Sequence, residues 1–489
     1  MKAVIIGGGV SGLAAGIYAQ MCGIESEIHE KHFILGGQCT GWKRKGHTLD
    51  NCVHWLTGTN PDTEVYKVWE DVGVLGDGVK IIQPESFMQV ELDGQSINLW
   101  QDTDRLRKDM LAISPEDAEA IEEFIGTVCI FKEFAMPGLK PFEMMTIIDK
   151  LKFLMKMKNV GKPYGKYSKM SIEDFASKFR HPLLRKLITT YLPYTYNTAS
   201  MFYTFGTFCS GNGALPEGGS LGMVARMEQK YRNLGGKVFT SHEAVGIDKE
   251  DDRISAVRFK DGSTATGDYI ILACDTNETF RHLIGEEMMD GYFRKRYKDE
   301  AEKYRIYCSI NCYLSLDGKA GDSLPGAIVV DAQTPFLAKH FDYEPSFAPD
   351  GKSVIQTISL QYEDDYDRWK ALYDSDREAY RQRKAEFGEM AKKALEQRFP
   401  EFEGKLEVLD VATPVTHERY CNAYKGAYMS FILTPFIKKE SHAGRLPGLK
   451  NLILAGQWLQ SPGGLPNAVV TGRFAIQRLC KTAGLKFCK

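Results

Sequence analysis

Short apolar runs alternate with polar and glycine-rich segments near both ends of the chain. Lys2–Ile6 is rich in β-branched residues and predicts a strand, Leu13–Cys22 predicts a helix, and Ser26–His29 predicts a second strand. The same alternation returns after about residue 210. There it predicts helices over Leu221–Leu234 and Pro466–Leu479 and strands over Lys237–Thr240, Ala244–Lys249, Arg253–Lys260, Tyr269–Ala273 and Asn451–Ala455.

The two middle stretches have a different pattern. Residues 96–209 show amphipathic, helical spacing with many Met and Phe residues, which predicts a helical cap. Residues 291–440 combine expected strands at Ile306–Leu316 and Ser353–Leu360 with a charged helix over Asp376–Gln397, which predicts a mixed α+β substrate-binding domain. The remaining ranges, 1–95, 210–290 and 441–489, are then parts of one discontinuous dinucleotide-binding domain. A chain of 489 residues is long enough for more than one core.

Three glycines stand directly after the first expected strand. Gly7, Gly9 and Gly12 have G-x-G-x-x-G spacing, and Glu30 follows the second strand. In a dinucleotide-binding βαβ unit such glycines permit the tight turn, the approach of a pyrophosphate and close helix packing, and the acid holds a ribose diol. The alternative is a glycine-rich turn in an unrelated α/β domain. The expected binding residues here are Gly7, Gly9, Val10, Ser11, Gly12 and Glu30.

Composition and charge narrow the function classes. With 62 basic and 64 acidic residues the formal charge is −2, so we expect no nucleic-acid partner. Eleven cysteines without a C-x-x-C pair fit reduced cytosolic thiols better than a disulfide framework or a zinc site, and no metal is expected. The apolar N-terminal stretch is interrupted by glycines, and no other run reaches the length of a membrane span, so the expected location is the cytoplasm.

Taken together, these segments resemble the flavin-containing amine oxidase superfamily, and more closely its branch of phytoene desaturases, carotenoid isomerases and retinol saturases. The resemblance spans nearly the whole chain. Asp50 with Val53-His54-Trp55 and Gly58 is similar to a stretch of carotenoid isomerases and retinol saturases. The other specific parts are the three N-terminal glycines with Glu30 and Gly36-Gly37, Pro216-x-Gly218-Gly219, Ala244-Val245-x-Ile247, and Ser461-Pro462-Gly463-Gly464-Leu465-Pro466.

Three positions depart from the family pattern. Gln38 stands where the family usually has Arg, which removes one charge contact to the FAD diphosphate or leaves it to Lys43 or Arg44. Cys52 stands where Gly is common, and Gly58 comes one residue late. These differences affect the backbone course expected beneath the flavin.

The resemblance implies an α/β fold with a Rossmann-like FAD-binding domain of the glutathione-reductase type and non-covalently bound FAD. The AMP end would lie on the N-terminal unit and the isoalloxazine ring near the C-terminal loop. Because only one complete fingerprint is present, a separate NAD(P) domain is not expected, and electrons come from the substrate or from an external donor or acceptor. The further FAD-binding residues implied are Gly36, Gly37, Gln38, Val245, Gly456, Gly463, Gly464 and Leu465.

His54 is the candidate catalytic residue, because the resemblance places it near the flavin and its unperturbed pKa lies near neutrality. The alternative is a structural histidine. Asp50 either supports His54 from behind or forms a turn, and the turn is the favoured interpretation. Tyr420, Tyr428 and Trp458 are candidates for lining the pocket or for plain core. His417 and Glu418 adjoin on an expected strand, where neighbouring side chains face opposite ways, so they are not expected to act as a pair.

Residues 144–169 contain apolar side chains at helical spacing and several lysines on the other faces. Two interpretations are open. Such a helix lies on an anionic membrane and passes lipophilic substrate to the pocket, or it packs on its own domain with solvated lysines.

The sequence therefore predicts an FAD-dependent oxidoreductase that acts on CH–CH or C=C bonds of a lipophilic substrate such as an isoprenoid or polyene. Hydride would pass to or from flavin N5. The alternatives are a redox-neutral FAD-dependent isomerase or hydratase, an amine oxidase, and a flavin-binding protein without catalysis. Because fold resemblance does not identify a substrate, the direction of the reaction stays open.

Overall fold

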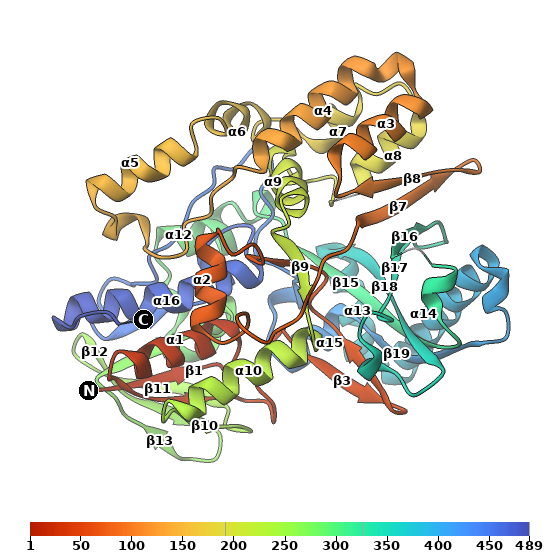
Figure 1. Ribbon diagram of the computed structural model, residues 1–489. Coiled ribbons are helices and arrows are strands. Elements are labelled where there is room, and N and C mark those ends of the chain that lie inside the picture. The colour runs from red at the N-terminus through yellow and green to blue at the C-terminus, as the bar shows by residue number, and fades with distance from the viewer. Residues whose placement is uncertain (191, 325, 489) are drawn as a thin grey trace.

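A five-stranded parallel sheet organises the end of the molecule where both chain termini lie (Figure 1). The computed structural model describes residues 1–190, 192–324 and 326–488. The sheet draws its strands from three distant parts of the chain, at the positions that the apolar runs predict. In spatial order they are β10 (Lys237–Phe239), β2 (Glu25–His29), β1 (Lys2–Ile6), β14 (Tyr269–Leu272) and β20 (Leu452–Leu454), and each pairing is parallel.

Alternate side chains of β1 point to opposite faces of the sheet and belong to two hydrophobic cores, one on each face. Ala3 and Ile5 pack towards helices, whereas Val4 and Ile6 pack against a small antiparallel sheet on the other face. A doubly covered parallel sheet of this kind is typical of nucleotide-binding domains. The helices are α1 (Val10–Met21), α10 (Gly219–Asn233) and α16 (Gly464–Ala483), and the small sheet comprises β11 (Ala244–Glu250), β12 (Arg253–Phe259) and β13 (Thr264–Ala265).

All three helices begin earlier than the apolar pattern suggests. α1 starts at Val10, α10 at Gly219 ahead of Leu221, and α16 at Gly464 ahead of Pro466. In each case glycines form the first turn or its cap, so the apolar pattern does not report the true start. In α1 and α16 the N-terminal N–H groups consequently lie among the glycines that the sequence assigned to ligand binding.

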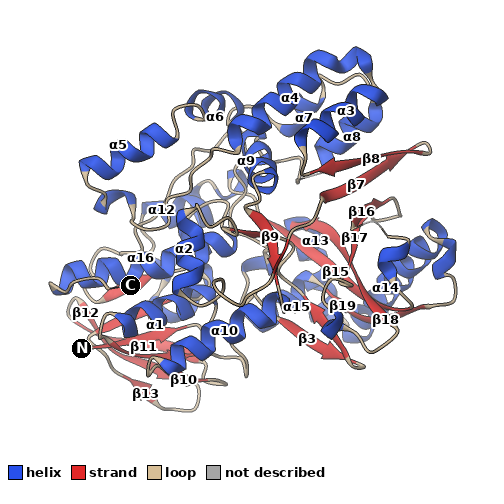
Figure 2. Ribbon diagram, in the orientation of Figure 1, coloured by secondary structure: helices blue, strands red, loops and turns tan. Residues whose placement is uncertain are grey.

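A seven-stranded sheet forms the core of the neighbouring region (Figure 2). One of its faces packs against α13 (Glu363–Ser375) and α14 (Arg377–Arg398). β7 and β8 pair with β16, so the boundary predicted at residue 95 divides a hairpin that belongs to this sheet. The strand order is β19 (Leu406–Ala412), β15 (Tyr307–Asp317), β18 (Lys352–Tyr362), β17 (Phe336–His340), β16 (Ala327–Val330), β7 (Ser86–Leu92) and β8 (Gln95–Trp100).

Helices lie above both sheets, as the Met- and Phe-rich pattern predicts. Most of them share an aromatic core that includes Phe124, Phe175 and Phe202. One helix, α5, stands apart in Figure 1 and has no buried residue, although Phe153 is half-buried and lines the cavity, so both interpretations of residues 144–169 stay predictions. The helices are α3 (Thr103–Ile113), α4 (Ala118–Phe131), α5 (Ile147–Lys156), α6 (Gly161–Tyr167), α7 (Ile172–Ala176), α8 (Pro182–Thr190) and α9 (Thr198–Cys209).

Short elements complete the connections between these layers. His417 and Glu418 lie on helix α15 (Pro414–Cys421) and not on a strand, because Thr413 and Pro414 form a helix start. The remaining elements are the hairpin β3 (Gly41–Arg44) and β4 (His47–Asp50), the sheet of β5 (Leu56–Thr57), β9 (Gly213–Pro216) and β6 (Ile81–Ile82), and helices α2 (Glu64–Asp71), α11 (Thr276–Glu278) and α12 (Gly291–Arg294).

Candidate functional site

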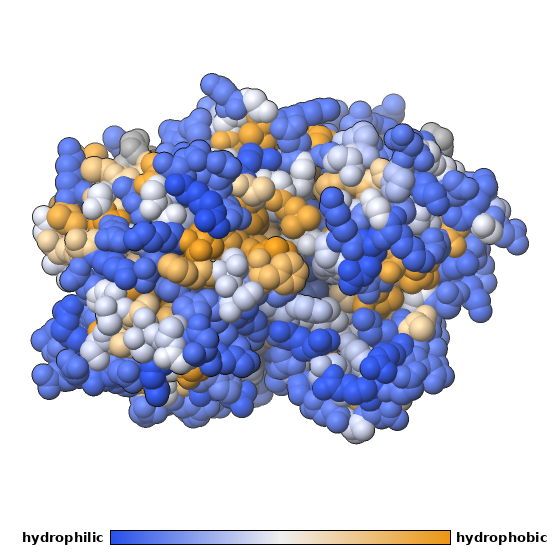
Figure 3. Space-filling model, turned by 90° about the horizontal axis from the view of Figure 1, so that it is seen from below, coloured by the Kyte–Doolittle hydropathy of each residue, from blue (hydrophilic) through white to orange (hydrophobic). Residues whose placement is uncertain are grey.

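A cavity of about 1090 Å³ runs from the carboxyl ends of β1 and β2, past the N-terminus of α16, to the underside of the helical layer. Seen from below, the surface is mostly hydrophilic, and apolar groups gather in a band across its middle (Figure 3). The cavity brings together most residues that the sequence assigned to the site. These are Gly7, Gly9, Val10, Ser11, Glu30, Gly36, Gly37, Gln38, His54, Gly456, Gly463, Gly464 and Leu465.

The glycine turn after β1 leaves room for a ligand. A Cβ added at Gly9 would meet nothing closer than 3.7 Å, whereas one at Gly7 would lie 3.0 Å from the Ala273 backbone. The Glu30 carboxylate is buried and accepts hydrogen bonds from the N–H groups of Gly8 and His32, each at 2.8 Å. Open space at the N-terminus of α1 beside a fixed acid suits a pyrophosphate and a ribose.

Gly12 and Val245 do not line the cavity. Gly12 has a packing role, because a Cβ there would lie 1.9 Å from the Gly7 oxygen. Val245 is 47% exposed, and Ala244, its neighbour on β11, lines the cavity instead. The β11–β12 register shifts between Ala244 and Gly246, and this irregularity places Val245 outside the cavity.

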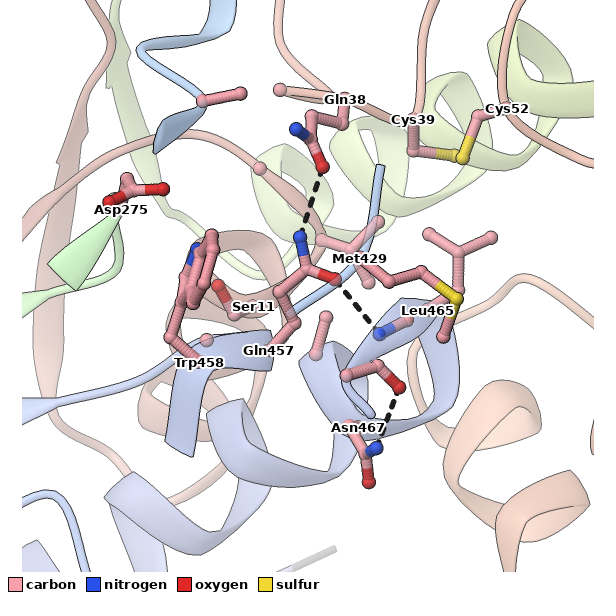
Figure 4. Close-up of a pocket in the computed structure, with 18 of the residues that line it drawn as sticks. Ser11, Gln38, Cys39, Cys52, Asp275, Met429, Gln457, Trp458, Leu465 and Asn467 are labelled. Atoms are coloured by element: carbon pink, nitrogen blue, oxygen red, sulfur yellow. Dashed lines mark hydrogen bonds between the residues drawn. The ribbon is translucent and has the colours of Figure 1, made fainter. Parts of the chain in front are cut away.

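Two glutamines connect the N-terminal loop to the start of α16 (Figure 4). Gln38 donates to the Ala427 oxygen at 2.7 Å and accepts from Gln457 at 3.0 Å. Gln457 in turn accepts the Gly464 N–H at 2.8 Å. Pro466 has no N–H, so the N–H of Leu465 is the first-turn donor of α16 that no hydrogen bond between described residues uses.

Gln38 therefore has a bridging role in place of the usual Arg. Arg44, which the sequence offered as a substitute cation, lines the cavity and forms an ion pair with Asp410 at 3.0 Å.

His54 is enclosed in the middle of the cavity. Among the described residues neither of its ring nitrogens has a hydrogen-bond partner. Its ring stacks on that of Tyr428, with the two ring centroids 5.8 Å apart. Burial, together with the positive charge of Lys339, lowers the pKa of His54 well below its ordinary value. The imidazole is neutral and has both nitrogens available to a ligand.

Lys339 on β17 is a buried cation that sequence reasoning missed. Its Nζ donates to the Val53 oxygen at 3.3 Å, and burial lowers its pKa to about 8 although the charge of Asp50 opposes the shift. The signal in the sequence was a lone lysine directly after the apolar run Phe336–Ala338, in a region with expected strands, although buried lysines are rare.

Asp50 anchors the loop below His54. Its Oδ1 accepts from the Ser220 hydroxyl at 2.7 Å, and its Oδ2 accepts from the Ser220 N–H at 2.6 Å. The carboxylate thus faces the N-terminus of α10, where the helix dipole favours an anion. The residue is structural, in keeping with the predicted turn.

The aromatic candidates Tyr420, Tyr428 and Trp458 all line the cavity. His417 lines it too, and burial lowers the pKa of His417 to about 4. Glu418 instead accepts a hydrogen bond from Tyr366 at 2.5 Å, so the two neighbours diverge.

Asp275 is a titrating group in the wall of the cavity (Figure 4). Burial raises its pKa from 3.8 to about 7, although the N–H groups of Tyr424, Asn277 and Glu278 donate to it and favour the charged form. The unfolded chain loses this proton near pH 4, whereas the folded protein keeps it until about pH 7. The stabilisation by this proton is therefore complete below pH 4 and is lost as the pH rises through 7.

We expect the melting temperature of the Asp275→Asn protein to fall less than that of the wild type between pH 4 and 8. The difference in unfolding free energy across this range is roughly 3 to 4 kcal/mol at most. Thermal unfolding in a pH series measures it. Asp102→Asn is the control, because hydrogen bonds lower the pKa of this exposed cap residue. The melting temperature of this variant should fall between pH 4 and 8 as much as that of the wild type does. Parallel curves for wild type and Asp275→Asn would contradict the assignment.

Comparison with known proteins agrees with this geometry. The model of the flavin-containing amine oxidoreductase family matches residues 10–480. The chain belongs to this family.

Relatives within the family are distant but cover most of the chain. A 4,4'-diapophytoene desaturase from Methylomonas is 23% identical over 99% of this chain and 96% of the relative. A prolycopene isomerase from Daucus carota is 21% identical over 87% of this chain and 71% of the relative. The resemblance to the carotenoid desaturase and isomerase branch is thus confirmed.

Solved structures support the fold. An oxidoreductase from Methanosarcina mazei superposes with a TM-score of 0.63, 17% identity and coverage of 98% of this chain and 100% of the other. A putrescine oxidase variant gives a TM-score of 0.60 at 12% identity, over 98% and 99% of the two chains. Like its family, the protein is an FAD-dependent oxidoreductase of α/β fold.

No helix in the ranges 1–190, 192–324 and 326–488 is long and apolar enough to cross a membrane. Within the same ranges, no group of three or more His, Cys, Asp or Glu side chains is arranged to hold a metal ion.

Proposed function

We propose that this flavin-containing amine oxidoreductase transfers hydride between FAD and a CH–CH or C=C unit of a lipophilic substrate. The observation that carries this proposal is the apolar chamber beyond His54. Its walls come from the helical layer and from Leu433, and they include Phe134, Met136, Phe153, Tyr164 and Tyr203. A dry aromatic chamber continuous with the flavin site suits a polyene or isoprenoid chain.

The residues at the cofactor end of the cavity fit FAD, and different residues would bind different parts of it. Open space at Gly9 would accept the pyrophosphate, and Glu30 would hold the adenosine ribose. The Leu465 N–H and the positive end of α16 would stabilise negative charge on the bound flavin. When bound, FAD supplies the hydride acceptor or donor.

His54 orients the substrate and handles its proton. Because the imidazole is neutral and unpartnered, one ring nitrogen accepts a proton and the other N–H donates a hydrogen bond. Stacking on Tyr428 fixes the ring plane. This arrangement suits a reaction that removes or adds one proton next to the hydride transfer.

A redox-neutral isomerase is the second candidate. The relatives include prolycopene isomerases as well as desaturases, and the same chamber holds a polyene for either reaction. The two functions differ in whether the flavin changes redox state over a turnover.

The experiment is anaerobic. The flavin of the purified protein is reduced, a lipid extract is added, and the visible flavin band is followed while the lipids are separated by chromatography. Reoxidation with one extract fraction supports the reductive direction, and bleaching of oxidised flavin supports desaturation. A polyene that changes isomer under a constant flavin band supports the isomerase. Amines that alone exchange electrons with the flavin would contradict both lipid functions.

We further propose that α5 contacts a membrane surface and delivers substrate. Ile147, Ile148, Leu151, Leu154 and Met155 are between 55% and 79% exposed on this one short helix. Lysines accompany these side chains, and Phe153 of the same helix lines the cavity. An apolar face flanked by cations is typical of helices that lie in the headgroup region of an anionic bilayer.

We expect Ile148→Glu with Leu151→Glu to reduce binding to vesicles that contain anionic phospholipid by at least about tenfold. The reason is that each apolar side chain contributes roughly 1.5 to 3 kcal/mol when buried. Co-sedimentation measures the binding. Leu234→Glu, at the exposed end of α10, is the control and should bind as the wild type does. Equal binding by all three proteins would rule out α5 as the membrane contact.

A further inference from the structure

Cys39 and Cys52 face each other across the extension of a β hairpin. In the β3–β4 ladder Gly41 pairs with Asp50, and the Asn51 N–H donates to the Thr40 oxygen at 3.1 Å. The next pair in this register is Cys39 with Cys52. Opposed residues in antiparallel strands have Cβ atoms roughly 4.5 to 5.5 Å apart, close to the roughly 3.5 to 4.5 Å that a disulfide spans.

The side chains also meet. Figure 4 shows the two sulfur atoms directed towards each other, and the Cys39 thiol acts on Cys52 electrostatically, while the Cys39 Sγ–H donates to the Ser220 oxygen at 3.8 Å. Both residues are free thiols in this structure. Backbone register and side-chain direction therefore agree that a Sγ–Sγ bond can form with little movement.

This pair lies in the wall of the flavin cavity. Both cysteines line it, Cys39 is only 1% exposed, and His54 follows Cys52 by two residues. The buried Lys339 ammonium acts on Cys52 electrostatically. A buried and a half-buried thiol beside a buried cation, in the wall of the proposed flavin site, have the components of a two-electron redox unit.

We propose that Cys39 and Cys52 are a second two-electron centre, which exchanges electrons with the flavin by reversible formation of a disulfide. In the forward step two S–H bonds break and one Sγ–Sγ bond forms. The oxidised flavin takes two electrons and one proton, and Lys339 Nζ, or the solvent through it, takes the second proton. In the reverse step the disulfide returns to the dithiol at the expense of reduced flavin. This inference rests on the proposed flavin site.

The pKa values of Cys52 and Lys339 explain why Lys339 can accept a proton in this step. The neighbouring Cys39 thiol and burial raise the pKa of Cys52 well above its ordinary value, so Cys52 keeps its proton at neutral pH. Oxidation of the pair must therefore release protons inside the cavity. The Lys339 amine has a pKa of about 8, so a fraction of it is deprotonated near neutrality and accepts one.

The test is an anaerobic dithionite titration of the air-oxidised holoprotein. The wild type should consume about four electrons per flavin, whereas Cys39→Ser and Cys52→Ser should each consume about two. Cys274→Ser is the matched control, because this cysteine also lines the cavity but its sulfur contacts the Thr279 hydroxyl, and it should consume about four.

Peptide mapping of diamide-treated and reduced protein gives a readout that does not depend on flavin or lipid. Oxidised wild type should show the two peptides joined, with a mass lower by two hydrogens. The map also separates this bond from any bond among Cys22, Cys480 and Cys488, which lie near the C-terminus. Uptake of about two electrons by the wild type, or two freely alkylated thiols after oxidation, would overturn the proposal. Uptake of four electrons without turnover of any lipid would overturn only the proposed function.

Discussion

The His54→Ala protein should keep its FAD and lose most of its turnover, with kcat lower by about 10² to 10⁴-fold. His54 is neutral, enclosed and without a partner among the described residues, and it lines the cavity between the cofactor end and the apolar chamber. Its removal takes away a proton-handling group but none of the glycine or carboxylate contacts of FAD. Stopped-flow measurement of flavin reduction or reoxidation with the substrate fraction separates these effects.

Two further variants sharpen this experiment. His54→Asn keeps a hydrogen-bonding group but cannot transfer a proton, so recovery of the rate by Asn would show a positioning role and not acid–base catalysis. His417→Ala is the matched control, because this histidine is also half-buried, lies on the cavity wall and has no hydrogen-bond partner at Nε2 among the described residues. If the two alanine variants lose equal activity, the assignment of His54 is wrong.

The Gly9→Val protein should fold as the wild type does and bind FAD at least about a hundredfold more weakly. Gly9 has φ −71° and ψ −178°, a conformation that any residue adopts. In the absence of a ligand an added Cβ would lie no closer than 3.7 Å to another atom, which is an ordinary contact distance. That space is the approach path for the pyrophosphate, and loss of two hydrogen bonds to a charged group costs roughly 3 kcal/mol or more. Fluorescence titration of the apoprotein with FAD measures the change.

The controls for this prediction separate binding from folding. Gly291→Val lies at the start of α12, where an added Cβ meets no atom within 4 Å, and its FAD affinity should be unchanged. Gly12→Val should instead lower the melting temperature of the apoprotein, since its Cβ would collide with the Gly7 oxygen. Normal affinity in Gly9→Val would place the pyrophosphate elsewhere.

The spacing of apolar residues and glycines was sufficient to predict much of the secondary structure of the nucleotide-binding domain. The strands at Lys2–Ile6 and Tyr269–Ala273 and the turn at Gly7–Gly12 follow from periodicity and glycine positions within short windows. Errors arose where tertiary contacts decide. One example is β7, which joins a sheet most of whose strands lie far along the chain, whereas the helix start at Thr413 and Pro414 was a local signal that the strand prediction overlooked.

The sequence by itself determined the dinucleotide turn, the acid at Glu30, the glycine-rich start of the last helix and the presence of a Met- and Phe-rich helical layer. Each depends on neighbouring residues, for which backbone geometry fixes the outcome. Long-range packing was needed to show that His54 is neutral and has no hydrogen-bond partner among the described residues, that Lys339 acts on Cys52, and that Cys39 opposes Cys52. Desolvation and electrostatic interaction depend on which distant segments surround a group, and no local pattern of residues contains that information.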